Sequence, residues 1–363
     1  MEIVPQGFRW EPAVYEHKAA LISRSPAEVS VSADLLVEAL IAERRVYQAD
    51  LITVGIDVYN LEAEALGAEP SAVDPHACPE IRAPLWSLDS LPRELELPRV
   101  PDAGRFALML EAASRFRDHL ESGAATPVRQ PRVRVAASGP ASIAAKLVGA
   151  EDLLMGMLTD ESAATRVLEF ATEVAASWLD AIRDAGHEAI LFDSSASPPL
   201  LSPELYRRVI APLHVRLMSL LASSGQRERP LVMGGDTTEL VPALLGAGAT
   251  SIVCDYSVGS EAFAAALASA ARSPRPAAGD VDTLPVVRRN FDPRRLASPP
   301  ESGELAGFVS GLRELASAPA AVVIGTGILA YGQRPGNVTD FLEELSRECG
   351  RRRIRVDLEP DTP

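Results

Sequence analysis

Cysteine is scarce in this chain, and long apolar runs are missing from it. Three cysteines in 363 residues provide no disulfide framework, and their spacings match no zinc-ribbon pattern. No apolar segment reaches the roughly 18 residues that span a bilayer, and Met1–Trp10, with Glu2 near its start, lacks the layout of a signal peptide. These absences predict a protein of the reducing cytoplasm that does not enter a membrane.

Positive charge is in deficit as well. The chain has 35 Lys and Arg against 50 Asp and Glu, a formal net charge of −15. Phosphate contacts need clustered Lys and Arg, so we expect neither nucleic acid nor an anionic membrane as the main partner. What the chain does contain is apolar residues, 47% of the total. That content is enough for a large core, either in one large barrel or in two domains.

Short apolar runs, each followed by turn residues and a helical pattern, recur along the chain. In the clearest, PLVMGGDTTEL at residues 230–240, the pattern predicts a buried strand, a glycine turn and a capped helix start. Glycines there let the backbone approach a ligand, although a tight turn capped by Asp236 is the simpler interpretation. Six further strands are predicted at residues 50–57, 132–137, 189–192, 250–254, 276–278 and 321–324.

These units predict the fold class. We expect an eighth strand inside or beside Pro70–Val100, a long stretch rich in Pro and Asp. Seven or eight strands alternating with helices favour a single α/β domain, a closed (β/α)8 TIM-type barrel, over an open sheet. The predicted boundaries are an amino-terminal arm at residues 1–31, the barrel at residues 32–349 and a charged tail at residues 350–363.

Carboxylates follow many of the predicted strands, at the end where such barrels carry their chemistry. Some of them are helix caps, because Asp is favoured between strand and helix. Converging like charges would raise one another's pKa values unless cations or hydrogen-bond donors offset them, which favours a functional mouth. The aspartates concerned are Asp57, Asp193, Asp236, Asp255, Asp280 and Asp282.

From this group we predict Asp57, Asp193 and Asp236 as catalytic residues. The residues predicted to bind substrate are Asn60, Glu62, Gly234, Gly235, Asp255, Asp280, Thr326 and Tyr331. Caps and loop salt bridges remain the alternative for these polar residues. A further pair, His76 and Cys78, has a spacing seen in metal sites, but two ligands in a loop do not define one.

Several longer motifs resemble one family. They are VGIDVYNLEAEALG at residues 54–67, LSPE at 201–204, GDTT at 235–238 and GTGI at 325–328. In this order they resemble the uroporphyrinogen decarboxylase superfamily, in particular its branch of corrinoid-dependent methyltransferases such as those acting on methylcobalamin and coenzyme M. The resemblance implies a (β/α)8 barrel, a small-molecule substrate, and a corrinoid that serves as a substrate or is carried on a partner protein.

Two departures limit what the resemblance implies. Methyltransferases of this branch bind zinc through a His-x-Cys pair and a later Cys, and the matching positions here are Val232, Gly234 and Thr326. None of these residues can replace a thiolate or an imidazole, so no zinc is predicted there. The decarboxylases carry paired amino-terminal arginines that hold substrate carboxylates, and Arg9 and Arg24 lack that context.

Three functions remain open from the sequence. The first is methyl transfer between a corrinoid and a small acceptor without zinc. The second is decarboxylation of a porphyrinogen or a smaller carboxylic acid, with Asp and Tyr residues transferring protons. The third is binding of a corrinoid or a related ligand without catalysis.

Overall fold

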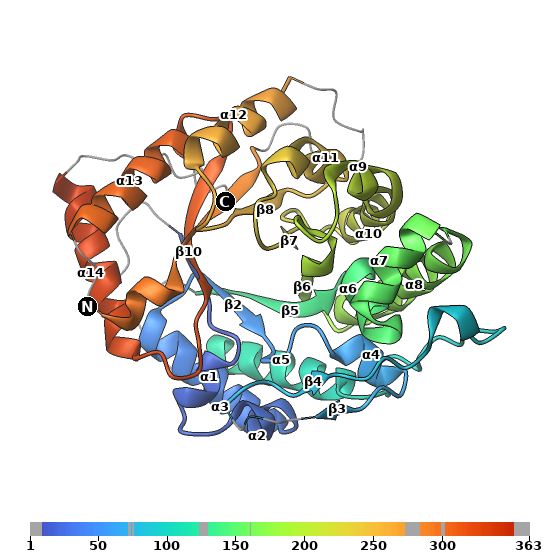
Figure 1. The fold of residues 1–363 in the computed structure, drawn as a ribbon. Coiled ribbons are helices and arrows are strands. Elements are labelled where there is room, and N and C mark those ends of the chain that lie inside the picture. Colours follow the sequence, from blue (N-terminus) through green and yellow to red (C-terminus); the bar gives the residue numbers. More distant parts are fainter. Residues whose placement is uncertain are drawn as a thin grey trace.

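The structure, a computed structural model, describes residues 9–71, 74, 76–122, 130–159, 161–272, 284–298 and 302–351. Within these ranges, eight parallel strands form a ring with helices around it (Figure 1). The strands are β1 (Trp10–Ala13), β2 (Leu51–Val54), β5 (Arg132–Ser138), β6 (Glu188–Phe192), β7 (Leu231–Val232), β8 (Ser251–Cys254), β9 (Val286–Phe291) and β10 (Ala321–Ile328).

Two four-stranded sheets make up the ring, in the orders β1-β10-β9-β8 and β2-β5-β6-β7. Backbone contacts connect the sheets at both seams. Between β7 and β8 there is a parallel bridge from Pro230 to Ser251, and next to β2 the amide of Asp50 donates to the Trp10 carbonyl of β1 at 2.8 Å. The predicted (β/α)8 TIM-type barrel is therefore confirmed.

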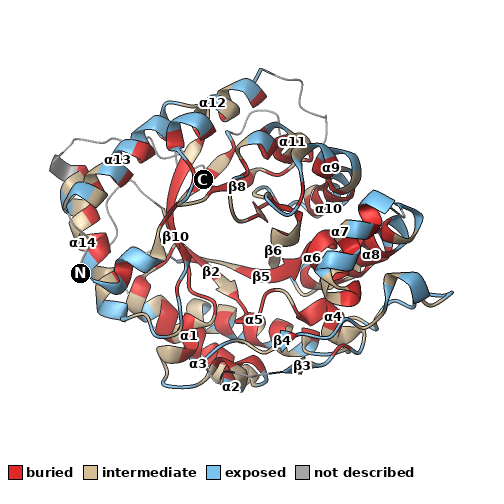
Figure 2. Cartoon of the chain, in the orientation of Figure 1, coloured by how far each residue is buried: buried red, intermediate tan, exposed pale blue. Residues whose placement is uncertain are grey.

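Helices cover the outside of the ring, with their buried faces turned toward the strands (Figure 2). None of the described helices is both long enough and apolar enough to cross a membrane. A short antiparallel pair, β3 (Pro70–Ser71) and β4 (Glu80–Ile81), lies outside the barrel sheets. The helices are α1 (His17–Ala20), α2 (Pro26–Ser30), α3 (Ala33–Tyr47), α4 (Leu61–Ala65), α5 (Phe106–Glu121), α6 (Pro140–Val148), α7 (Ala150–Thr159), α8 (Glu161–Asp184), α9 (Pro203–Leu205), α10 (Ala211–Ser223), α11 (Val241–Gly246), α12 (Ser260–Ala270), α13 (Ser302–Ala316) and α14 (Pro335–Arg351).

Local sequence explains where several of these helices begin. The Ser32 hydroxyl accepts a hydrogen bond from the Leu35 amide and caps α3. Ser202 caps α9 in the same way, and Pro203 occupies the first turn, where its missing N–H costs nothing.

One strand prediction needs correction, and another lies outside the described residues. The strand expected near Pro70–Val100 is instead β1, within the segment 1–31 that was expected to be an arm. β1 pairs in parallel with β10, and α1 and α2 follow it within that segment. The strand predicted at 276–278 lies outside the described residues, as do Asp280 and Asp282, and the strand between β8 and β10 is β9. Of the predicted tail, residues 352–363 also lie outside the described residues.

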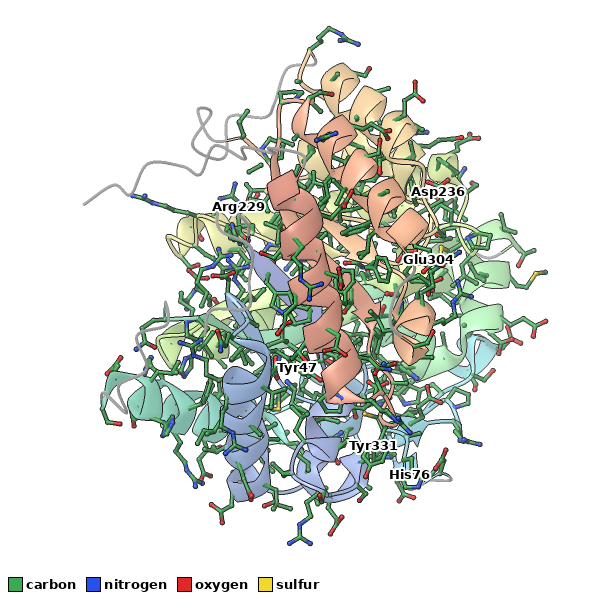
Figure 3. The ribbon with its side chains drawn as sticks, turned by 90° about the vertical axis from the view of Figure 1, so that its left-hand side faces the viewer. Tyr47, His76, Arg229, Asp236, Glu304 and Tyr331 are labelled. Carbon is green, nitrogen blue, oxygen red and sulfur yellow. The ribbon has the colours of Figure 1, made fainter. Side chains whose placement is uncertain are left out.

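Alternate side chains of the strands face the interior of the barrel and the helices, as the pleat requires. A separate apolar cluster fills the interior, whereas the larger core lies between strands and helices. Figure 3 shows the two ends of the barrel, with Asp236, Tyr331 and His76 at one end and Arg229 at the other. The interior cluster consists of Ala13, Tyr15, Leu51, Val58, Ala136, Ile190 and Phe192, with Tyr59 and Val232 packed against it.

Candidate active site in the barrel interior

Asp57 follows β2 and is buried by its partners. One carboxylate oxygen accepts from Arg105 at 2.8 Å, and the other accepts from the Asn60 side chain at 2.8 Å and from the Tyr59 amide at 3.3 Å. Arg105 also pairs with Glu64 at 2.6 Å. This arrangement fixes the loop after β2, so the catalytic role of Asp57 stays a prediction beside a clear structural one.

Asn60 and Glu62 also hold this loop in place. The Asn60 side chain bonds to the Pro79 carbonyl and to the Ile81 amide, which anchors the excursion that carries β4. Glu62 is buried and accepts from the Ser138 amide at 2.6 Å and from its hydroxyl at 2.7 Å. Burial raises the pKa of Glu62 to about 7, against the lowering effect of its hydrogen bonds to Ser138.

Asp193 follows β6 but turns away from the interior. Phe192 belongs to the interior cluster, so the next side chain points toward the helices. There the Asp193 carboxylate accepts from the amides of Ala141 and Ser142 at the start of α6, at 3.2 and 2.7 Å. His214 of α10 lies 2.8 Å from the same carboxylate. The structure thus places Asp193 between the barrel and its helices.

The Asp193 contact with His214 is part of a longer chain of hydrogen bonds. The other ring nitrogen of His214 lies 2.9 Å from the Tyr206 hydroxyl, and all three side chains are buried. Burial raises the pKa of Tyr206, so its phenol stays neutral and can bond to the ring. Because Ser194 follows Asp193 directly, this chain fixes the backbone that carries Ser194.

Asp236 and Asp255 cap the turns in which they lie. Asp236 is exposed and accepts from the amide and hydroxyl of Thr238. Asp255 accepts in the same way from Ser257. Together with Asp57 and Asp193, they make four described aspartates of the predicted mouth that all have hydrogen-bond partners within the fold, so the carboxylate-rich mouth stays a prediction.

Gly234 and Gly235 lie where β7 ends. Gly235 has a φ of +73°, and a Cβ on it would stand 2.9 Å from the Pro198 carbonyl, so only glycine suits this turn. A Cβ on Gly234 would stand 3.9 Å from the Ser194 hydroxyl. Gly234 therefore lies beside Ser194, and its role in substrate binding stays a prediction.

Thr326 and Tyr331 lie apart from each other. The Thr326 hydroxyl accepts from the Ala13 amide at 3.3 Å and is fully buried. Tyr331 stacks on His76, with ring centroids 4.8 Å apart. Cys78 donates to the Ile56 carbonyl, whereas His76 stacks on Tyr331. The two residues considered for a metal site thus have separate partners.

Aromatic and hydroxyl groups line the interior at the carboxyl ends of the strands. The hydroxyls of Tyr59 and Ser194 share a hydrogen bond of 2.6 Å. Tyr15 and Tyr59 both pack edge-on against Phe192, with centroids 5.6 and 6.1 Å away. Burial raises the pKa of both tyrosines, so both phenols are neutral hydrogen-bond donors.

Two polar residues of β9 also face the interior, and sequence reasoning missed them. Arg288 and Asn290 are buried, and a Cβ on Gly325 would stand 2.8 Å from both side chains. Arg288 hydrogen-bonds to Tyr15 and lowers the pKa of that phenol, against the larger effect of burial. The signal that could have found them is the alternation of Val286, Arg288 and Asn290 with Val287, Arg289 and Phe291. Because the first set is mostly polar, this alternation does not look like that of a buried strand.

The sequence matches a known protein family. The model of the uroporphyrinogen decarboxylase (URO-D) family matches residues 12–301. The chain belongs to the uroporphyrinogen decarboxylase family.

Two relatives of this family member are methyltransferases. A methylated-thiol–coenzyme M methyltransferase from Methanosarcina mazei is 27% identical over 192 residues, which make up 52% of this chain and 48% of that protein. The chain thus spans about half the length of this curated relative. A solved structure described as a methyltransferase from Methanosarcina mazei has a TM-score of 0.70 and 15% identity, covers 96% of this chain and 92% of its own, and shows the shared fold. The predicted resemblance to the methyltransferase branch is confirmed.

The residues of this family member do not fit the zinc that the resemblance implies for the methyltransferase branch. Val232 offers an isopropyl group to the interior, and Gly234 has no side chain. Thr326 shares the outer face of β10 with Val322 and Ile324, which pack in the helix-facing core. In the part of the chain that the structure describes, no three His, Cys, Asp or Glu side chains gather into a metal-binding group. We therefore assign no chemical step to zinc.

Proposed function

We propose that this protein transfers a methyl group between a corrinoid and a small acceptor without zinc. The family and the two methyltransferase relatives support methyl transfer. Within the family, the choice between methyl transfer and decarboxylation rests on the carboxylates that follow the strands. The oxygens of Asp57 and Asp193 are occupied by partners within the fold, which disfavours a decarboxylase that uses them to transfer protons.

The interior suits displacement at a methyl group. A lone pair of the acceptor forms the new bond to carbon, the electron pair of the cobalt–carbon bond stays with the corrinoid, and the acceptor loses its proton. Such a step is faster when water is excluded from the nucleophile. Tyr15, Tyr59, Phe192 and Val232 pack together in the interior, and their ring and aliphatic surfaces would provide that exclusion.

The test is an anaerobic assay with methylcobalamin and separate thiol, phenol and amine acceptors. We expect loss of the methylcobalamin absorbance with at least one acceptor, and the same rate after treatment with a chelator. A rate that is lost on chelation and recovered with zinc would overturn the zinc-free proposal. A protein-free mixture is the blank for each acceptor.

A second candidate is the decarboxylation of a small carboxylic acid. The neutral phenols of Tyr15 and Tyr59 could supply a proton, and Arg288 could hold a carboxylate. Release of carbon dioxide from a carboxylic acid, without consumption of methylcobalamin under any acceptor, would favour this candidate over methyl transfer.

A further inference from the structure

A π-helical turn interrupts the helical segment that carries His214. Residues Tyr206–Ile210 form this π-turn between α9 and α10. At its end the Ala211 amide bonds to the Tyr206 carbonyl, five residues back instead of four. The segment therefore contains one residue more than a continuous α-helix would use. Such turns are rare and frequently lie at functional sites.

Burial shows that the extra residue shifts the helix register. After His214, the next buried side chains of α10 are Leu217 and Met218, at α-helical spacing. Seven residues span about two α-helical turns, so a continuous helix would place Arg207 on the face of His214. Arg207 is instead exposed, and Tyr206, one residue earlier, is buried.

Pro212 gives a physical reason for the position of the π-turn. Proline has no backbone N–H, and in a continuous helix the ring of Pro212 would clash with the Arg208 carbonyl four residues earlier. A wider turn before Pro212 relieves that clash. Pro212 then lies in the first turn of α10, where a missing N–H costs least.

The register shift brings Tyr206 to His214. The Tyr206 hydroxyl lies 2.9 Å from Nδ1 of the ring, and the Asp193 carboxylate lies 2.8 Å from Nε2. Because the carboxylate accepts, Nε2 carries the ring proton, and Nδ1 accepts from the neutral phenol. Without Tyr206, Nδ1 would be a buried acceptor without its donor, which is costly.

Asp193 connects this chain of hydrogen bonds to the candidate site. Its carboxylate is also held by two amides at the start of α6. A Cβ on Gly139 would stand 2.5 Å from the Asp193 side chain, so this glycine leaves room for it. Asp193 precedes the 3-10 turn Ser194–Ala196, whose Ser194 hydroxyl meets Tyr59.

We propose that the π-turn is a one-residue register shift that places Tyr206 against His214, and that these two side chains are positioning residues for the turn Ser194–Ala196. The phenol fixes the tautomer of the ring, the ring fixes the carboxylate of Asp193, and the carboxylate fixes the turn. This inference goes beyond the proposed methyl transfer. It concerns the place of Ser194 and holds for any reaction in the interior.

A deletion tests the register shift. Arg208 is exposed and lies in the π-turn. Its deletion, combined with Pro212→Ala to remove the ring, should leave a continuous α-helix. Tyr206 and His214 are then seven residues apart and still share a face. We expect this variant to melt within about 4 °C of wild type.

The matched control deletes one exposed residue from the regular part of α10. Deletion of Val215 turns Leu217 and Met218 by about 100° away from the core. This control should melt far below wild type or fail to fold. Equal effects of the two deletions would overturn the register shift.

Nitrogen NMR of protein labelled at histidine tests the positioning role. Wild type and the π-turn deletion should both show His214 with a protonated Nε2 and an accepting Nδ1. In Tyr206→Phe, which keeps the ring, the Nδ1 signal should move to that of a free acceptor. The amides of Ala196 and Ser197 close the turn, and they should exchange hydrogen about tenfold faster, as the loss of one hydrogen bond predicts.

Tyr47→Phe is the control for this substitution. It removes the phenol from another buried histidine, His17, whose Nε2 lies 2.6 Å from the Tyr47 hydroxyl. It should change the His17 signals and leave the exchange of Ala196 and Ser197 as in wild type. A His214 signal that Tyr206→Phe does not move, or equal amide exchange in both variants, would overturn the positioning role.

Discussion

Two arginines face the same small cavity of the barrel, yet the fold treats them differently. Arg134 of β5 is 1% exposed and pairs with Glu188 and Glu228, both at 3.0 Å. Arg288 of β9 is similarly buried, and among the described residues it has no carboxylate within 4.0 Å, although Glu11 lines the same cavity and interacts with it electrostatically. The paired charge stabilises the base of the barrel, whereas the unpaired one costs stability. That difference distinguishes a charge that the fold pairs closely from one that it leaves without a close carboxylate.

Breaking the paired arginine should have the largest effect on stability. Arg134→Met leaves Glu188 and Glu228 without the cation between them. We expect the free energy of unfolding to fall by about 3 kcal/mol, the lower end for breaking a buried pair, because Glu228 keeps Arg9 and Arg132. Urea denaturation of the two proteins measures it. A loss no larger than that caused by Arg115→Met, on the exposed outer face of α5, would show that the base is not held by this pair.

Glu62 is intermediate between the two arginines. It is buried with hydrogen-bond donors, and among the described residues it forms no ion pair within 4.0 Å. Its pKa is about 7 in the folded protein and 4.5 ordinarily, so the folded state holds the proton more tightly. The stabilisation is full below about pH 4.5 and is lost as the pH rises through 7.

The variant that tests this is Glu62→Gln, which keeps an acceptor for the Ser138 amide and does not titrate. Between pH 4.5 and 7, wild type should lose more unfolding free energy than the variant, by an amount on the order of 2 kcal/mol. Denaturation midpoints across this range measure it. Parallel pH profiles for the two proteins would contradict the raised pKa.

Arg288→Met should have a smaller effect and the opposite sign from Arg134→Met. Removing an uncompensated buried charge, with a side chain of similar length in its place, should leave the free energy of unfolding unchanged or raise it by about 1 kcal/mol. The measurement is urea denaturation without ligand. A clear loss of stability would mean that Arg288 is paired within the fold and is structural, as Arg134 is.

The same contrast explains how much the sequence could predict. Strands with apolar inner faces, such as β6 and β8, were predicted close to their observed bounds. β1 and β9 were missed because Glu11 and Arg288 point inward and Pro12 interrupts the β1 pattern, so neither run reads as a buried strand. In these two strands the inward polar residues hide the pattern, whereas β5 was predicted although its Arg134 also faces the cavity.

For the candidate site, the sequence indicated residues at the strand ends but not which way their side chains point. Sequence reasoning found the residues that follow strands, including Asp193 and Gly234, but the direction of each side chain depends on the pleat. Once Phe192 faces the interior, Asp193 must face the helices. The contact between Tyr59 and Ser194 joins residues 135 positions apart, which no local pattern reveals.

Asp236 should give the smallest effect of all. Its carboxylate is exposed and accepts from the amide and hydroxyl of Thr238 within its own turn, and Asn can accept the same hydrogen bonds. Asp236→Asn should therefore change the free energy of unfolding by less than about 0.5 kcal/mol. In the methylcobalamin assay its turnover should equal that of wild type. Unchanged stability with a turnover lowered tenfold or more would instead support the catalytic role predicted from the sequence, because a cap alone gives no reason for such a loss.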